Sequence, residues 1–214
     1  MSTVAFAQEP VKFGVKAVLN FASQSVSFDG DEDVDSKSKP VTTFHLGAYA
    51  DISISDVFSV QPGLSLSGKG SRSEYSDSEE SAGETYTYSD KETTNIMYVE
   101  IPVNAIYKFN NFYIGAGPYA AFAISGKYKS ESTVTEGAKT ESSKEEEDIK
   151  FGSGDEDSFK NTDFGLNLMA GYQLPSGLNF GLGYGFGLAN IASHTENNYS
   201  VKNKVLSISV GFSF

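Results

Sequence analysis

Apolar residues alternate with small or polar residues in eight long segments, and this alternation constrains the fold more than any other feature of the chain. In the clearest segment Leu178, Phe180 and Leu182 are separated by asparagine and glycine. A period of two places successive side chains on opposite faces of a β-strand. The eight segments cover about residues 11–27, 41–54, 57–72, 94–109, 112–129, 160–174, 178–191 and 200–214.

The segments are long, and the links between them alternate in length. A tilted strand needs about nine to eleven residues to cross a bilayer, whereas the usual strand has about five or six. Short turns at Ser55-Asp56, Asn110-Asn111 and 175–177 follow the second, fourth and sixth segments, and longer polar links follow the others. The sequence therefore predicts an all-β fold: an eight-stranded antiparallel up-and-down transmembrane β-barrel with short periplasmic turns and long acidic extracellular loops.

The acidity of the chain is confined to three of the long links. The net charge is −12, but residues 28–40, 74–93 and 131–159 alone carry −3, −6 and −7, so the remaining residues are weakly basic. A chain without a basic surface is not expected to bind nucleic acid. It has no cysteine, which excludes a disulfide scaffold and thiolate metal sites.

Two kinds of eight-stranded barrel could show this alternation: a soluble ligand carrier with an apolar interior, and a membrane barrel with an apolar exterior. The less apolar face distinguishes them. It consists mainly of glycine, serine and asparagine and lacks the many lysines and glutamates of a water-facing surface. We therefore predict that the apolar face contacts lipid. The titratable side chains expected inside the barrel are Lys12, Lys16, His45, Asp51 and Glu100.

These interior groups allow two functional interpretations. Charges in a narrow barrel are expected to neutralise one another, because a buried charge needs a partner. The alternative is a narrow pore or a small-ligand carrier. Because an eight-stranded interior is normally filled by side chains, we favour neutralisation.

Two further groups of residues are candidate sites. Carboxylates alternate at Asp29, Asp31, Asp33 and Asp35, which makes them a weak candidate for Ca²⁺ or Mg²⁺, but the glycine and glutamate of an EF-hand loop are not at the required positions. A solvated loop, or a surface for a protein partner, is the preferred interpretation of all three acidic links. His194 would be needed in the least favoured hypothesis, an outer-membrane lipid hydrolase.

The first residues are typical of the end of a secretory signal. Ala5-Phe6-Ala7 fits a small-x-small cleavage site. We therefore interpret residues 1–8 as a residual signal-peptide tail and residues 9–214 as one barrel domain.

Several stretches together resemble the PorT-like family of small outer-membrane β-barrel proteins. They are Phe13-Gly14-Val15-Lys16, Val60-Gln61-Pro62-Gly63-Leu64-Ser65-Leu66-Ser67-Gly68-Lys69-Gly70, Tyr98-Val99-Glu100-Ile101-Pro102-Val103, Gly115-Ala116-Gly117-Pro118-Tyr119, Asp163-Phe164-Gly165-Leu166 and Tyr184-Gly185-Phe186-Gly187-Leu188-Ala189-Asn190-Ile191. The resemblance implies an eight-stranded barrel in the outer membrane of a Gram-negative-type envelope, with no catalytic motif and no cofactor. Some relatives are linked to protein export. The terminal aromatic residues Phe212 and Phe214 resemble the signal read by barrel-assembly machinery.

From these observations we expect a non-enzymatic envelope scaffold or interaction protein, with export or envelope assembly as its setting. The expected partners are outer-membrane lipid, the barrel-assembly machinery and a protein at the acidic loops. We expect a monomer with extracellular loops and both termini in the periplasm.

Overall fold

A computed structural model of the chain describes residues 11–27, 38–81, 84–137, 139–154, 157–194 and 198–214. Residues 1–8, interpreted above as a signal-peptide tail, lie outside this part. The described strands are β1 (Lys12–Ser27), β2 (Ser38–Lys39), β3 (Val41–Ser53), β4 (Phe58–Ser81), β5 (Glu84–Phe109), β6 (Phe112–Glu136), β7 (Lys139–Asp148), β8 (Thr162–Gln173), β9 (Leu178–Gly187) and β10 (Ser200–Ser213).

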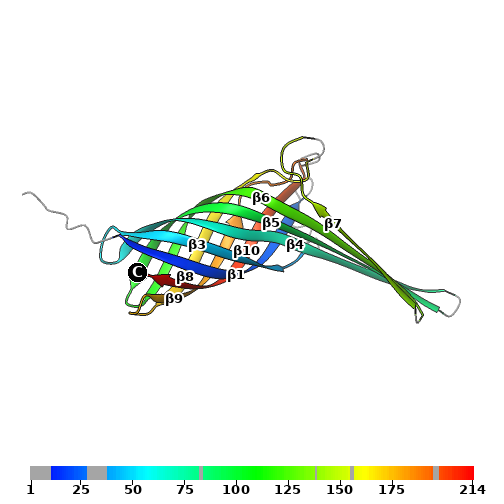
Figure 1. The fold of residues 1–214 in the computed structure, drawn as a ribbon, viewed down its shortest axis with the longest axis horizontal. Helices are drawn as coiled ribbons and strands as arrows, with labels where there is room; N and C mark the ends of the chain where they lie inside the picture. Colours follow the sequence, from blue (N-terminus) through cyan, green and yellow to red (C-terminus); the bar gives the residue numbers. More distant parts are fainter. Residues whose placement is uncertain (1–10, 28–37, 82–83, 138, 155–156, 195–197) are drawn as a thin grey trace, which may run out of the picture.

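Eight of the described strands close a ring (Figure 1). Each pairs antiparallel with the next in the order β1, β3, β4, β5, β6, β8, β9 and β10, and β10 returns to β1. The closing pair runs from Gly14 opposite Ser213 to Ser27 opposite Ser200. The predicted eight-stranded antiparallel barrel is therefore confirmed. None of the described residues forms a helix long and apolar enough to span a membrane.

The barrel wall is apolar on its outer face, as the alternation predicts. Large side chains such as Leu64, Phe164 and Leu182 are more than half exposed there. The intervening residues point inward, where Asn20, Ser65 and most of their counterparts on other strands are buried. A surface of this size and composition is unstable in water, whereas lipid tails would cover it.

Inside the barrel, three tyrosines lie over glycines of the neighbouring strand. Tyr49 is the register partner of Gly14, and Tyr113 is that of Gly171. A Cβ atom added at either glycine would collide with the tyrosine ring. Tyr119 lies over Gly165 in the same way. The glycines thus let large rings lie flat against the wall of a narrow barrel.

One end of the barrel has the short turns that the sequence predicts, and we call it the short-turn end. The β5–β6 turn places Asn110 at φ 53°, and the β8–β9 turn places Gly177 at φ 92°. Both values lie in the left-handed region that asparagine and glycine tolerate best. The main chain of Phe214 exchanges hydrogen bonds with that of Phe13 at this end, at 2.8 and 3.1 Å.

The opposite end differs from the prediction of acidic loops. Residues 72–81 of β4, 84–95 of β5, 127–136 of β6 and all of β7 continue the strands into a four-stranded sheet beyond the ring, which we call the ribbon (Figure 1). Serine, threonine and tyrosine are frequent in these stretches, and threonine and tyrosine favour strands. Cross-strand ion pairs such as Lys91 with Glu131 offset the high charge that suggested loops.

Candidate functional site

A buried ion-pair network crosses the barrel interior. The Nζ atom of Lys69 lies 2.9 Å from Glu100 Oε2 and 3.1 Å from Asp163 Oδ2. All three side chains are almost completely buried, and they come from β4, β5 and β8. Because burial of an unpaired charge is costly, each of these groups depends on the others to remain charged.

Aromatic and amide side chains complete this network. The Tyr119 hydroxyl donates to Asp163 Oδ2 at 3.2 Å, and its ring centroid lies 3.9 Å from Lys69 Nζ. Asn203 of β10 donates to the same carboxylate oxygen at 3.0 Å. Tyr98 is fully buried beside them. The network therefore joins five strands of the ring, and together with Ile96 and Ile149 its side chains fill the barrel at this level.

A second polar cluster lies near the short-turn end. Lys108 Nζ donates to Asp51 Oδ2 at 2.7 Å, and Gln61 Nε2 donates to the same oxygen at 2.9 Å. The hydroxyls of Tyr49 and Ser213 are 2.8 Å apart. Asp51 is thus neutralised by a lysine that is itself partly exposed.

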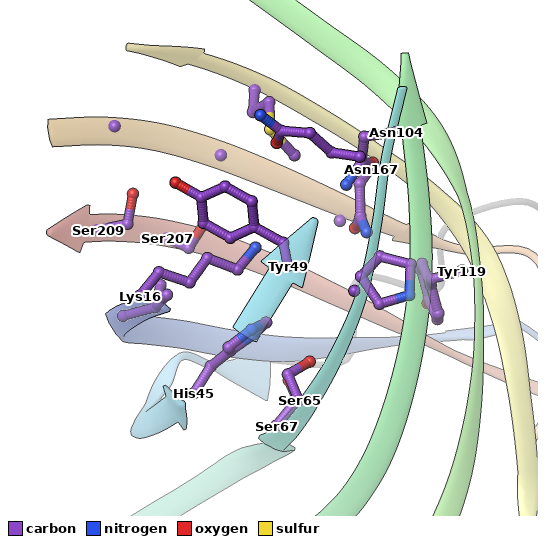
Figure 2. A pocket seen from close by; sticks show the side chains of 18 of the residues that line it. Lys16, His45, Tyr49, Ser65, Ser67, Asn104, Tyr119, Asn167, Ser207 and Ser209 are labelled. Carbon is purple, nitrogen blue, oxygen red and sulfur yellow. The ribbon is translucent and has the colours of Figure 1, made fainter. Parts of the chain in front are cut away.

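A cavity of about 110 Å³ lies between these two clusters (Figure 2). Lys69, Glu100 and Tyr119 line it on the ribbon side, and Lys108 and Gln173 line it on the short-turn side. Lys16 and His45 reach into it from neighbouring strands, as do several serines. The space exists because β9 contributes glycines, not larger residues, to this part of the wall.

The five interior residues predicted from the sequence take different positions. His45, Asp51 and Glu100 are buried inside the barrel. Lys16 lines the cavity, and Lys12 is exposed at the rim. The structure brings Glu100 into the ion-pair network and Asp51 into the second cluster, and it brings Lys16 and His45 together at the cavity.

Sequence reasoning missed the cations that neutralise these acids. Lys69 and Lys108 are the partners of Glu100 and Asp51, and Asp163 is the third member of the network. The alternation of apolar and polar residues in the sequence indicated that Lys69 and Asp163 point into the barrel. Lys69 follows Ser65 and Ser67 on the less apolar face, and Asp163 precedes Gly165 on the same face of its strand.

The other candidate sites are not assembled by the described residues. The aspartates at 29, 31, 33 and 35 lie outside them. Within the described ranges no group of three or more possible metal ligands is close enough to hold an ion. His194 is exposed, and the Ser193 hydroxyl beside it donates to the main-chain oxygen of Gly152 at 3.1 Å. Phe212 and Phe214 are exposed on the outer face.

The ribbon has two faces of different charge, which follow from its register. One face continues the inner wall of the barrel through Tyr98 and Ile96 of β5. We call it the acidic face. Its described charged residues are eight carboxylates and one lysine: Asp77, Glu79, Asp90, Glu92, Glu136, Glu141, Glu145, Glu147 and Lys139.

The acidic face also exposes large uncharged side chains. Tyr75, Tyr86, Tyr88 and Val134 lie among its carboxylates and are all exposed. The Tyr86 hydroxyl donates to Glu136 Oε1 at 2.9 Å. This face thus offers aromatic rings and negative charge side by side.

The opposite face of the ribbon, which we call the balanced face, carries equal numbers of both charges. Its described members are five cations and five carboxylates: Arg72, Lys91, Lys127, Lys129, Lys144, Glu74, Glu80, Glu131, Glu146 and Asp148. Glu131 binds Lys144 at 3.1 Å and Lys91 at 3.3 Å, and Lys129 binds Glu146 at 2.6 Å.

Ion pairing on the balanced face changes the titration of its carboxylates. Hydrogen bonds from Lys127 and Lys129 lower the pKa of Glu146 to about 2. Hydrogen bonds from Lys144 and Lys91 lower the pKa of Glu131. These carboxylates are therefore paired with lysines within the sheet. On the acidic face, Glu141 is the one of the eight described carboxylates that forms an ion pair, with Lys139 at 2.6 Å.

A comparison with known protein families agrees with the barrel. A family described as outer membrane protein beta-barrel domain matches residues 6–193. Among solved structures, neisserial surface protein A is 16% identical with a TM-score of 0.45, and the alignment covers 96% of this chain and 100% of that one. Ail of Yersinia pestis, in complex with a heparin analogue, is 12% identical with a TM-score of 0.41, covering 95% and 99%. OprG of Pseudomonas aeruginosa is 14% identical with a TM-score of 0.37, covering 97% of each chain. A search of curated proteins found no match.

Proposed function

This chain belongs to the outer membrane protein β-barrel domain family, and from that membership we propose that it is a non-enzymatic envelope scaffold whose ribbon binds a cationic protein segment. The observation that supports this most directly is the separation of charge between the two faces of the ribbon. Carboxylates outnumber lysines eight to one among the described residues of the acidic face, while the balanced face is neutral.

The partner proposed for the acidic face is an extended segment rich in lysine and arginine. Carboxylates would attract it at long range. Exposed Tyr75, Tyr86 and Tyr88 would then contact the aliphatic parts and charged groups of its side chains, because cations bind favourably over aromatic faces. Complementary charge mainly determines the association rate and the choice of partner.

The barrel beneath the ribbon serves in this proposal as an anchor in the outer membrane. The filled layer around Lys69 supports a closed interior over the alternative of an open pore. An exposed His194 with its neighbouring serine hydrogen-bonded to Gly152 gives no support to a lipid hydrolase.

The proposal also specifies orientation and setting. Short turns of such barrels face the periplasm, so the ribbon would be extracellular and both termini periplasmic. Exposed Phe212 and Phe214 would be read by the barrel-assembly machinery, and the folded chain would be a monomer in outer-membrane lipid. The stretches that resemble PorT-like proteins support a link with export or envelope assembly.

The test uses the full chain folded in detergent micelles and a fluorescent peptide of mixed lysine and glycine as the probe. One variant neutralises the acidic face through Asp90→Asn, Glu92→Gln and Glu145→Gln. A matched variant removes the same charge from the balanced face through Glu74→Gln, Glu80→Gln and Asp148→Asn. Fluorescence anisotropy at several salt concentrations measures the affinity of each.

We expect the acidic-face variant to bind the peptide at least about tenfold more weakly than the matched variant. The two proteins have the same net charge, so a difference between them reports the position of the charges. Equal losses in both variants would show that only total charge attracts the peptide, and the proposed binding face would then be wrong.

A further inference from the structure

We propose that the interior cavity is a binding site for a small oxyanion, a carboxylate or a phosphate, held by Lys16 and His45. This inference concerns the barrel and is independent of the partner proposed for the ribbon. It rests on two polar side chains that line the cavity, a lysine without a carboxylate partner and a histidine with one unpaired ring nitrogen.

Lys16 is the interior lysine at the cavity that lacks a carboxylate partner. Lys69 and Lys108 each have a carboxylate oxygen within 3.1 Å. The Lys16 side chain lines the cavity. Among the described residues, no carboxylate oxygen lies within 4.0 Å of its Nζ atom, the distance limit for an ion pair. Its three N–H donors are therefore available to a molecule in the cavity.

His45 lines the same cavity and has an unpaired ring nitrogen buried in the wall beside it. Its side chain is 8% exposed, and its Nε2 atom has no hydrogen-bond partner in the described structure. The ring lies over Gly47, since a Cβ atom added there would be 3.3 Å from Nε2. Gly47 is the register partner of Lys16, so the imidazole and the ammonium group come from adjacent positions of the wall.

The rest of the lining suits a polar ligand of a few atoms. The hydroxyls of Ser65, Ser207 and Ser209 and the amide of Asn167 surround the cavity (Figure 2). Its volume is about 110 Å³. One water molecule needs roughly 10–15 Å³ by this measure, so the space accommodates the four or five heavy atoms of acetate or phosphate.

The cavity is closed at one end and lined by partly exposed residues at the other, and this difference determines where a ligand would enter. Towards the ribbon, the Lys69 network and the buried Tyr98 and Ile96 close the interior. Towards the short-turn end, the lining includes Lys108 and Gln173, which are partly exposed. A ligand would thus enter and leave at the same end, and the site would act as a pocket, not as a channel.

The chain contains two histidines, which provide an internal comparison. His45 lines the pocket, and His194 is exposed at the other end of the molecule. The full chain in detergent micelles is titrated with sodium acetate or sodium phosphate, with sodium chloride holding the ionic strength constant. NMR of the imidazole Cε1–Hε1 groups follows both residues at one pH.

We expect a saturable shift of the His45 signal with at least one of the two oxyanions, and no saturable shift of His194. Saturation by acetate alone identifies a carboxylate site, and saturation by phosphate alone identifies a phosphate site. If neither anion gives a saturable shift of His45, or if both histidines shift in parallel, the inference is wrong. The wild-type chain provides this test by itself.

A pair of variants tests the role of Lys16. Lys16→Met removes the ammonium group inside the pocket, whereas Lys12→Met removes an exposed one four residues earlier on the same face of β1. Since hydrogen bonds to charged groups are among the stronger polar contacts, Lys16→Met should weaken binding by about tenfold or more. Lys12→Met should leave it unchanged, and equal effects of the two variants would overturn the assignment of Lys16.

Discussion

At the scale of single residues, the barrel interior contains ion pairs and hydrogen bonds between strands, and these form only when the strands pair in one register. Lys69 has carboxylate oxygens of two other strands within 3.1 Å, and Tyr119 both covers its ammonium group and donates to Asp163. Removal of Lys69 leaves the Glu100 and Asp163 carboxylates buried without a cation. Such a network favours one register of the strands that contribute to it.

The cost of losing Lys69 can be measured. Lys69→Met should lower the free energy of unfolding by about 3–5 kcal/mol, because Glu100 and Asp163 would remain buried as unpaired charges. Urea unfolding in lipid vesicles, followed by tyrosine fluorescence, gives this value. Lys91→Met removes a lysine from the exposed pair with Glu131 and should cost about 1 kcal/mol or less. If the two variants were equally destabilised, Lys69 would not be the centre of a buried network.

At the scale of elements, the ribbon is held by pairs that are exposed to water. Glu146 accepts hydrogen bonds from Lys127 and Lys129 of the neighbouring strand β6, and these lower its pKa to about 2. A carboxylate whose pKa is lower in the folded state contributes stability above its ordinary pKa, and that contribution is lost as the pH falls towards the folded value.

The β6–β7 pairing should therefore weaken between about pH 4.5 and pH 2. The hydrogen-exchange protection factors of residues 127–130 and 145–148, which correct for the intrinsic slowing of exchange in acid, should fall over this range. The Glu146 carboxyl carbon should titrate near its lowered pKa. In the double variant Lys127→Gln and Lys129→Gln, the pKa should return towards the ordinary value of glutamate. An ordinary pKa of Glu146 in the wild-type chain would disprove the pairing.

Comparison of the sequence with the elements shows which features could be predicted. The membrane-crossing parts of all eight strands were predicted, because lipid outside and small residues inside impose a strict period of two. The ends of β4, β5 and β6 were not. In the ribbon both faces meet water, so polar residues occupy both and the period of two becomes invisible.

A β-bulge is a second reason why the sequence does not predict the extended end of β6. Pairing between β5 and β6 shifts between Met97 and Tyr98, so β6 changes which of its residues face inward. Before the shift Tyr119 and Ala121 point inward, and after it Gly126 does. A bulge of this kind interrupts the alternation at the level of the sequence while the sheet itself continues.

At the scale of the whole molecule, a closed barrel with an apolar outer face is joined to a ribbon whose two faces are both polar. In the barrel interior Glu100, Asp163 and Asp51 are paired with lysines, and the excess negative charge lies on one face of the ribbon. The candidate site could be predicted only in part. The sequence showed Glu100 and Asp51, but their lysines come from other strands, and a single sequence gives no register between strands.

The closed interior predicts the electrical behaviour of the protein. The wild-type chain should give no discrete conductance steps in planar lipid bilayers, because the Lys69 network and its aromatic neighbours fill the barrel. A variant with Lys69→Ser, Glu100→Ser and Asp163→Ser, which hollows this layer, should show steps if it inserts. Discrete steps in the wild-type chain would contradict the closed interior.

The continuity of β4, β5 and β6 from the barrel into the ribbon has a mechanical consequence. Their main-chain hydrogen bonds run across the strands, perpendicular to the direction in which the ribbon extends. Tension applied at the tip therefore loads many of these bonds together in shear and does not break them one after another. A molecule attached to the ribbon would therefore pull on the wall of the barrel itself, because the same three strands form both.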